Sequence, residues 1–383
     1  MPVDFLDNTT GEPVRQVTLP SGRRAWLVHS YELARQVLND AGLSNDKSSL
    51  GKRSPLAALP PRERAIFEND LLNTDPPHHT RMRKLVSRAF TARASAAFRP
   101  AAERIAEELV DSFAHEPEAD LFTRYTKPLT TLALADLLGI PRADCARVRA
   151  WCDVFAADVL RIQDRTLVAA AEMLEYVRDL GQRKRLAPGE DLISQLSTAG
   201  VSADDQCSLV MLVLIAGQTA TTQMITRGLC LLLTHPEQLA SVRADPALLP
   251  GAVEEILRHA TPLRITSFRV SFSKPLRVGA VEIPAGEIVG CALPDANRDP
   301  ARFPDPDTFD VHRTDNPHLA FGLGPHWCVG ASLARLEAKV AITVLLRRFR
   351  HVELAVPEEE LPRLYTPLMT QLVGLPVRLE PTC

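Results

Sequence analysis

The chain has 383 residues, of which 45% are hydrophobic and 24% charged, and its formal net charge at pH 7 is −3. This length can bury a large core, and the slightly acidic balance gives no general reason to expect binding to nucleic acid or to an anionic membrane. Residues 1–30 lack a basic segment followed by an apolar run, so we expect neither a signal peptide nor a membrane anchor. We therefore expect a cytoplasmic protein.

The N-terminal part alternates strand and helix signals. Residues 14–28 predict two short strands joined at 19–22, and residues 31–38 predict a helix. Residues 41–70 mix Gly, Ser, Asn, Lys and Pro with little periodicity, which is typical of a long connection, and such connections often carry function.

Residues 80–249 show an almost entirely helical pattern, interrupted near 139–141, 187–189 and 200. Within it, Leu209–Ile215 is apolar on every side, which predicts a buried helix that then turns small and polar over 216–222. Further along, Glu255 and Arg258 lie three apart on one predicted helical face, where a surface ion pair is the plain interpretation. Residues 270–290 return to strand character, and residues 294–317 should be irregular.

The most informative segment is the glycine-rich run of residues 321–330, which contains Cys328 and precedes a predicted helix over 331–349. Cys328 would lie at the N-terminus of that helix, where unpaired backbone N–H groups and the helix dipole lower a thiol pKa. A lone cysteine is otherwise usually a small buried hydrophobe. The seven cysteines contain no Cys-x-x-Cys pair, and their odd number suits a reducing compartment. A Cys/His zinc site is disfavoured, because His326 and Cys328 have no nearby partner pair.

The segment resembles the haem-binding loop of cytochromes P450, whose pattern Phe-x-x-Gly-x-x-x-Cys-x-Gly is met by Phe321, Gly324, Cys328 and Gly330. The resemblance extends over residues 71–378. It implies a mainly α fold with a small β-rich lobe, in which residues 1–383 form a single large domain. Residues 1–40 would contribute to the lobe, and residues 71–378 would form the haem-binding core and pocket. It also implies haem b with the Cys328 thiolate as proximal iron ligand, and O2 as co-substrate.

The resemblance further implies which side chains surround the haem. His79, Arg83, Arg269 and His326 match residues that contact the two propionates, although each cation taken alone is more often a solvated surface residue. Phe321 and Gly322 belong to the same cofactor-binding set. Arg313 would join Glu255 and Arg258 in a buried ionic triad that acts as a structural clamp.

The sequence departs from the family at the oxygen-activating helix. The family pattern expects an acid followed by an alcohol, which relay protons, but Thr219 and Ala220 occupy those positions. A displaced hydroxyl of Thr219 or Thr221 with ordered water, a polar group on the substrate, or chemistry less dependent on proton delivery would each explain this, and we favour the first two. Gln218 is a further candidate. Alternatively, Thr221 and Thr222 merely bond back to helix carbonyls.

The resemblance places two segments beside the substrate. One is Leu263, Arg264, Ile265 and Thr266, and the other contains Leu368 and Met369. An inward Arg264 would select a carboxylate or another polar acceptor, and an outward orientation is an equal alternative.

The resemblance implies a haem-thiolate monooxygenase that oxidises a small organic molecule by hydroxylation, oxidative C–C or C–N coupling, or desaturation. By analogy with the family, we expect a role in specialised metabolism, such as antibiotic biosynthesis. No flavin or nicotinamide motif is present, so electrons should come from a separate ferredoxin and ferredoxin reductase. Arg81, Lys84, Arg88 and Arg335 form either their docking face or a solvated surface. We expect a monomer without nucleic-acid or membrane partners. The alternatives are a non-turnover haem-thiolate binding or gas-sensing protein and a peroxide-driven peroxygenase.

Overall fold

The computed structural model describes residues 11–19, 22–46, 48, 54–158, 162–366 and 368–382. Some predicted features therefore lie outside the described residues. They are residues 1–10 of the expected lobe, the turn residues Pro20 and Ser21, parts of the 41–70 connection, and Cys383.

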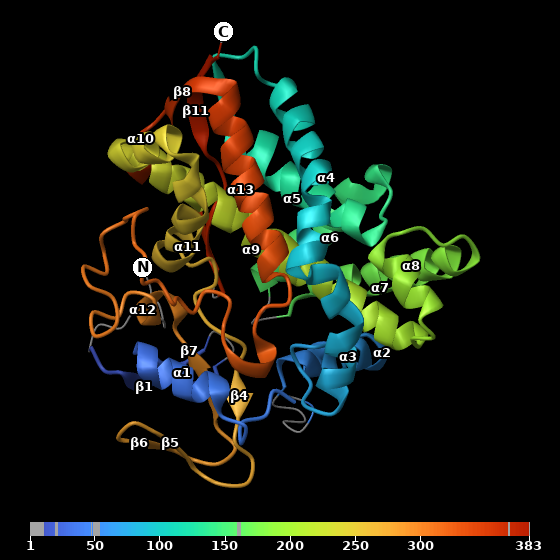
Figure 1. Cartoon of the computed structure of the whole chain (residues 1–383). Helices are drawn as coiled ribbons and strands as arrows, with labels where there is room; N and C mark the ends of the chain where they lie inside the picture. Colours follow the sequence, from blue (N-terminus) through green and yellow to red (C-terminus); the bar gives the residue numbers. More distant parts are fainter. Residues whose placement is uncertain are drawn as a thin grey trace.

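One long helix, α9 (Ala203–Thr234), passes through the middle of the molecule and contacts α5, α6, α7, α11 and α13 (Figure 1). It is the one described helix that is long and apolar enough to cross a membrane, but 72% of its most apolar stretch is buried inside the molecule. The burial is the expected consequence of a helix that is apolar all round. The helices before it are α1 (Tyr31–Asn39), α2 (Pro61–Glu68), α3 (His78–Ser87), α4 (Ala92–Asp111), α5 (Lys127–Leu138), α6 (Cys145–Asp158), α7 (Asp164–Leu186) and α8 (Leu192–Thr198). Those after it are α10 (Pro236–Ala244), α11 (Leu249–His259), α12 (Leu293–Ala296) and α13 (Ala331–Arg348).

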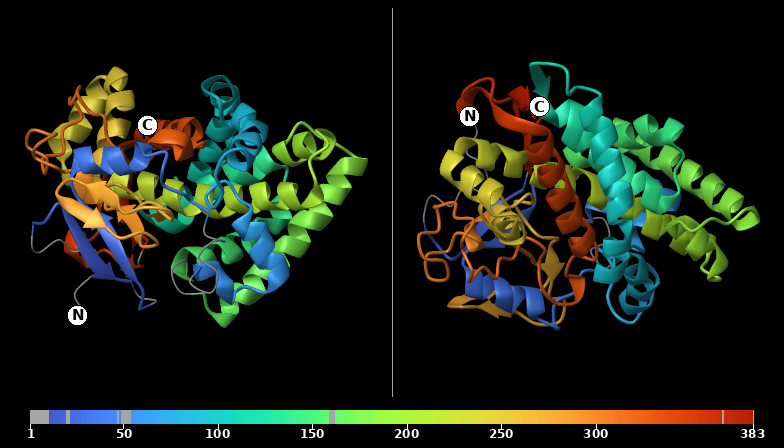
Figure 2. Two further views of the ribbon diagram at one scale, coloured as in Figure 1. Left: turned by 90° about the horizontal axis from the view of Figure 1, so that it is seen from below. Right: turned by 45° about the horizontal axis from the view of Figure 1, so that its top comes forward.

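The strands form small sheets at two ends of the molecule: those within residues 14–28 and 269–291 lie beside α1, and those within 349–354 and 376–381 lie near the C-terminus (Figures 1 and 2). The largest sheet has the order β1-β2-β7-β4, in which β2 and β7 are parallel and the outer pairs antiparallel. Its strands are β1 (Val14–Thr18), β2 (Arg24–Val28), β4 (Arg269–Val270) and β7 (Ile288–Cys291). The others are β3 (Glu118–Asp120), β8 (Phe349–Leu354) and β11 (Pro376–Pro381) in one sheet, and the hairpins β5 (Leu276–Val278) with β6 (Val281–Ile283) and β9 (Arg363–Tyr365) with β10 (Thr370–Leu372).

The structure confirms the predicted class of one mainly helical domain with a small β-rich lobe. The strands in 14–28, the helix from Tyr31, the strands in 270–290 and the helix from Ala331 are present. Two details differ. β3 interrupts the region predicted as helical, because it pairs with the distant strand β11, and α12 lies at the edge of the segment predicted as irregular.

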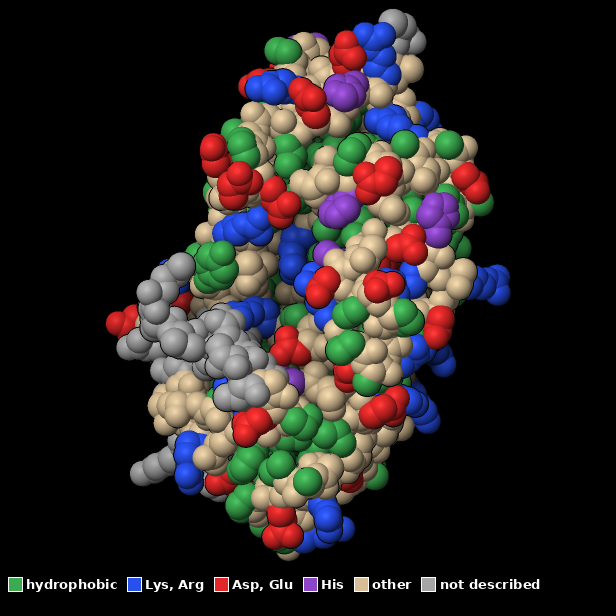
Figure 3. Space-filling model, turned by 90° about the vertical axis from the view of Figure 1, so that its left-hand side faces the viewer, with side chains coloured by type: hydrophobic (Ala, Val, Ile, Leu, Met, Phe, Trp, Pro, Cys, Tyr) green, Lys and Arg blue, Asp and Glu red, His purple; other side chains and the backbone are tan. Residues whose placement is uncertain are grey.

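The surface carries charges of both signs. On the face shown in Figure 3, Lys and Arg side chains alternate with Asp and Glu side chains, and no broad patch of one sign covers it. This mixture is consistent with the small net charge of −3.

Candidate functional site

Cys328 lies in a loop that is folded back on the N-terminal lobe. Its backbone N–H donates to the Phe321 carbonyl oxygen at 2.9 Å, which closes the loop just before α13. Gly324 has a φ of +76°, and a Cβ atom there would lie 2.5 Å from the Leu38 carbonyl oxygen, so the loop needs glycine at this position. The other described cysteines are buried, whereas Cys328 keeps part of its surface accessible.

The pKa of the Cys328 thiol is raised, because burial disfavours the charged thiolate. The expected lowering influences are present: the backbone N–H groups of Gly330 and Ala331, and the charges of Arg83 and Arg335. The prediction of a lowered thiol pKa is therefore wrong in its net direction, since desolvation outweighs the helix terminus. A metal that binds the sulfur would add the charge that favours the thiolate.

A group of donors from distant parts of the chain meets beside this loop. The rings of His79, on α3, and His326 lie 4.2 Å apart between centroids. Arg83, one turn after His79, donates to the Trp327 carbonyl oxygen at 2.6 Å. Arg269, at the start of β4, is buried and donates to the carbonyl oxygens of two residues at the end of α1, at 2.9 and 2.7 Å. The structure thus brings together all four residues predicted to contact carboxylates.

Two buried nitrogen atoms of this group have no hydrogen-bond partner among the described residues: Nε2 of His79 and Nε of Arg269. Burial, helped by neighbouring cations, also lowers the pKa of His79 and lowers that of His326 to about 3. Buried donors left unpaired and close to like charges are costly unless an anion completes them. The donor set therefore fits the carboxylates of a haem, and Cys328 fits its metal.

The polar part of α9 contains small residues that keep part of their surface accessible. Ala216 is exposed and Gly217 and Ala220 are partly exposed, although the helix around them is buried. Thr219 and Thr221 are themselves buried. The positions where the family pattern expects acid and alcohol thus carry short side chains that cannot ionise.

The opposite side of α9 is joined to α5 by a ladder of buried hydroxyl groups. Thr222 Oγ1 lies 2.6 Å from Thr130 Oγ1 and donates to the Gln218 carbonyl oxygen at 3.0 Å. Gln218 Nε2 donates to Thr131 Oγ1 at 2.6 Å, so its amide is directed at α5. The alternative interpretation is confirmed for Thr222, which bonds back to its own helix.

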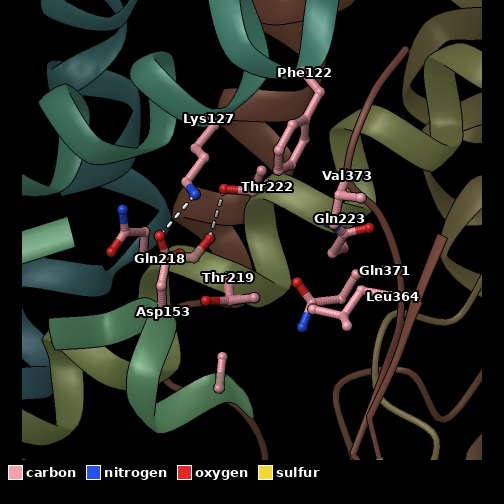
Figure 4. Close-up of a pocket in the computed structure, with 11 residues that line it drawn as sticks. Phe122, Lys127, Asp153, Gln218, Thr219, Thr222, Gln223, Leu364, Gln371 and Val373 are labelled. Carbon is pink, nitrogen blue, oxygen red and sulfur yellow. Dashed lines mark hydrogen bonds and ion pairs between the residues drawn. The ribbon is translucent and has the colours of Figure 1, made fainter. Parts of the chain in front are cut away.

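A pocket of about 260 Å³ opens beside this part of α9 (Figure 4). Sequence reasoning missed two of its residues, Lys127 at the start of α5 and Asp153 on α6, whose side chains form an ion pair at 2.8 Å. No motif marks either residue, because folding alone brings them together. The lining residues are Phe122, Lys127, Asp153, Ala156, Gln218, Thr219, Thr222, Gln223, Leu364, Gln371 and Val373.

The predicted clamp residues form the expected ion pairs. Arg258 makes two bonds of 2.8 and 2.7 Å to Glu255, and both side chains are fully buried. Arg313 reaches the same carboxylate at 3.3 Å, and Asn316 donates to it at 3.0 Å. Arg258 also donates to three backbone carbonyl groups of the irregular segment between α12 and the cysteine loop. The network links α11 to that segment and gives each buried charge a partner, without which its burial would be costly.

The two segments predicted to border the substrate do meet, because the Arg264 backbone N–H donates to the Leu368 carbonyl oxygen at 2.8 Å. Leu263, Arg264, Thr266 and Leu368 are partly exposed, and Met369 is buried. Ile265 is 2% exposed and packs in the apolar cluster of the large sheet, against which Leu368 also packs. The position of these residues beside the substrate stays a prediction.

Two members of the predicted basic docking face are paired within the chain. Arg335 makes two bonds of 2.7 Å to Glu254, and Arg81 lies 3.0 Å from Asp205. Their charges are therefore partly compensated, which leaves Lys84 and Arg88 as the stronger candidates for contact with an acidic partner.

Known proteins are similar to this chain in sequence and in fold. A family model described as Cytochrome P450 matches residues 189–372. Cytochrome P450 107B1 of Saccharopolyspora erythraea is 39% identical over 376 residues, which cover 96% of this chain and 92% of the relative. Cytochrome P450 monooxygenase PikC of Streptomyces venezuelae is 40% identical over 374 residues, covering 96% and 88%. The solved structure of the cytochrome P450 enzyme CxnD, for C–S bond formation in chuangxinmycin biosynthesis, matches with a TM-score of 0.87 at 35% identity, covering 97% of this chain and 92% of that one.

Proposed function

The chain belongs to the cytochrome P450 family, and on that premise we propose that it is a haem-thiolate monooxygenase that oxidises a small organic molecule in specialised metabolism. The observation that carries the proposal is the partly accessible Cys328 beside a buried donor set in which His79 Nε2 and Arg269 Nε have no partner among the described residues. A cysteine-ligated haem supplies the reductive activation of O2.

Each part of the site has a distinct task. Cys328 would hold the iron of haem b, and Gly322 and Gly324, with φ values of +70° and +76°, shape the loop that presents it. His79, Arg83, Arg269 and His326 would pair with the propionates; Phe321 would pack in the same cofactor-binding loop. Ala216 and Ala220 leave room for O2 and substrate on the accessible face of α9.

The reaction outcome follows from the substrate as much as from the fold. PikC is named as a monooxygenase and CxnD as an enzyme of C–S bond formation, so closely similar folds serve oxygen insertion and oxidative coupling. We propose oxygen insertion, with coupling as the second outcome, because Thr219 and Ala220 change the usual proton supply at α9.

The partners and location are part of the same proposal. A separate ferredoxin and ferredoxin reductase would deliver electrons to the cysteine side, where Lys84 and Arg88 offer positive charge. The protein would act as a cytoplasmic monomer, without nucleic-acid or membrane partners.

The first test is the absorption spectrum of the reduced holoprotein with carbon monoxide, compared with that of Cys328→Ala. A red-shifted Soret band that Cys328→Ala abolishes, and that Cys291→Ala retains, supports thiolate ligation by Cys328. Cys291 is a suitable control because it is fully buried in the sheet. An unchanged band in Cys328→Ala contradicts the proposal.

Product formation separates the rival functions. With a surrogate ferredoxin and reductase, a monooxygenase converts a substrate that shifts its ferric spectrum, whereas a sensor gives the spectral shift without product. Turnover that occurs with hydrogen peroxide but not with the reductase identifies a peroxygenase.

A further inference from the structure

The accessible face of α9 has no proton donor of its own. Between Cys207 and Arg227 the helix contains no ionisable side chain, and the positions of the usual acid and alcohol are Thr219 and Ala220. The reaction under "Proposed function" consumes protons when O2 is reduced. A donor on another element or on the substrate is therefore required, and this inference rests on that function.

The pocket of Figure 4 has one acid among its lining residues, which also include Thr219. Lys127 and Asp153 are the two charged residues that line it. The Asp153 side chain is 47% exposed, so it exchanges protons with bulk water, and the 23% exposed Lys127 holds its Oδ2 atom at 2.8 Å. The ammonium of Lys127 also lies 5.5 Å from the centre of the Phe122 ring, which fixes its position.

Most polar groups on the α9 wall of the pocket are already engaged. Both ends of the Gln223 amide bond to Leu372, at 3.0 and 2.8 Å, and Thr222 bonds to Thr130 and to its own helix. The Thr219 hydroxyl makes no hydrogen bond to any residue within the described ranges. Beside it, Gln218 is 2% exposed and its Oε1 atom has no partner among those residues. An unsatisfied acceptor and a free hydroxyl that line a pocket are where water binds.

We propose that Asp153 supplies the acid that α9 lacks, and that Thr219 is the hydroxyl through which protons pass from this pocket to the face of Ala220. Thr219 directly precedes Ala220 and borders the pocket, and in the view of Figure 4 its hydroxyl lies on the Asp153 side. Asp153 and Thr219 are thus positioned to act through water.

The transfer balances without any change in oxidation state. The Asp153 carboxylate takes a proton from bulk water and gives it to a water molecule in the pocket. That water passes a proton to Thr219 Oγ1, which releases its own proton toward the Ala220 side. Each group regains its starting form, and Lys127 remains an ammonium that orients the carboxylate. The net result is the movement of one proton across the wall formed by α9.

Solvent access to Thr219 is tested first, without turnover. In holoprotein carrying Thr219→Cys, a small cationic methanethiosulfonate should label the new thiol about tenfold or more faster than native Cys152. Cys152 is an internal reference because it is fully buried one residue before Asp153. Adding Ala156→Trp, at another lining position, should slow the labelling. Labelling as slow as that of Cys152 overturns the proposal.

The second test measures how much of the consumed O2 is reduced to hydrogen peroxide and how much to water. With a surrogate ferredoxin and reductase, Asp153→Asn should raise the ratio of hydrogen peroxide to water by about two orders of magnitude, the lower end of the range for a lost general acid. Asp204→Asn is the matched control, because that exposed carboxylate pairs with Arg178 far from the pocket's lining. Equal ratios in the two variants overturn the proposal.

A rescue separates proton transfer from a structural role. Thr219→Asp with Ala220→Thr restores the family's acid and alcohol on α9, and should return the ratio in Asp153→Asn toward that of the parent. No rescue, with labelling intact, assigns Asp153 a structural role and overturns the relay. Failure of the function itself is recognised separately, as loss of the carbon monoxide spectrum's dependence on Cys328.

Discussion

At the scale of single residues, the conformation of the cysteine loop depends on one glycine, Gly324, which lies close to the backbone of α1. Gly324 and Gly286 both have positive φ values, +76° and +80°. A Cβ atom at Gly324 would lie 2.5 Å from the Leu38 carbonyl oxygen, whereas a Cβ atom at Gly286 would meet nothing within 4 Å. Both alanine variants incur the left-handed backbone strain of about 1 to 2 kcal/mol. Only Gly324→Ala also pushes the loop away from α1.

We therefore predict that Gly324→Ala lowers the melting temperature of the holoprotein more than Gly286→Ala does, and that it alone weakens haem retention. Transfer of haem to apomyoglobin measures retention. The same transfer rate for the two variants would show that the loop tolerates the displacement.

The residues that could be predicted from the sequence lie within short local motifs. Cys328, the glycines around it and the Glu255–Arg258 spacing are readable because each set lies within one short segment. The direction of the Cys328 pKa was not readable, since desolvation depends on the whole surrounding fold. The pairing of Lys127 with Asp153 was hidden for the same reason: two helices must pack before the side chains meet.

At the scale of elements, the packing of α5 against α9 is made specific by buried hydroxyl pairs. Thr126, the residue just before α5, has its Oγ1 atom 2.6 Å from Thr226 Oγ1, and Thr130 Oγ1 lies 2.6 Å from Thr222 Oγ1. The rungs are therefore four residues apart along both segments. Matched spacing fixes the register of the helices, because a shift of one residue would bury unpaired hydroxyls. The periodic apolar pattern predicted the helices but not this register.

A double-mutant cycle tests one rung. Thr130→Val and Thr222→Val together should be less destabilising than the sum of the single changes, with a coupling of about 1 kcal/mol. Thr222→Val combined with Thr234→Val should be additive, because Thr234 bonds to carbonyl oxygens at the far end of α9. Urea denaturation measures both cycles, and additivity in the first would show that the rung contributes no pairwise energy.

At the scale of the whole molecule, stability at mildly acid pH depends on groups that the fold holds uncharged. His259, at the end of α11, is surrounded by Arg298 and the irregular segment after α12. Its Nε2 donates to the Asp307 carbonyl oxygen at 3.0 Å, so Nδ1 is left as the acceptor facing Arg298 at 3.3 Å. Burial, together with the charge of Arg298, lowers the pKa of His259 from 6.5 to about 4.

The direction in which stability changes with pH follows from the lowered pKa of His259. Between pH 4 and 6.5 the unfolded chain binds a proton at His259 and the folded chain does not, so folding is favoured fully above pH 6.5 and progressively less as pH falls toward 4.

We predict that the melting temperature of wild type falls between pH 7 and pH 5, and that His259→Gln removes part of the fall. Glutamine suits this site because its amide can donate to Asp307 and accept from Arg298 without titrating. His351→Gln, at an exposed histidine beside Glu353, should leave the fall unchanged. If His259→Gln and His351→Gln melt with the same pH dependence, the acid sensitivity of the fold arises elsewhere.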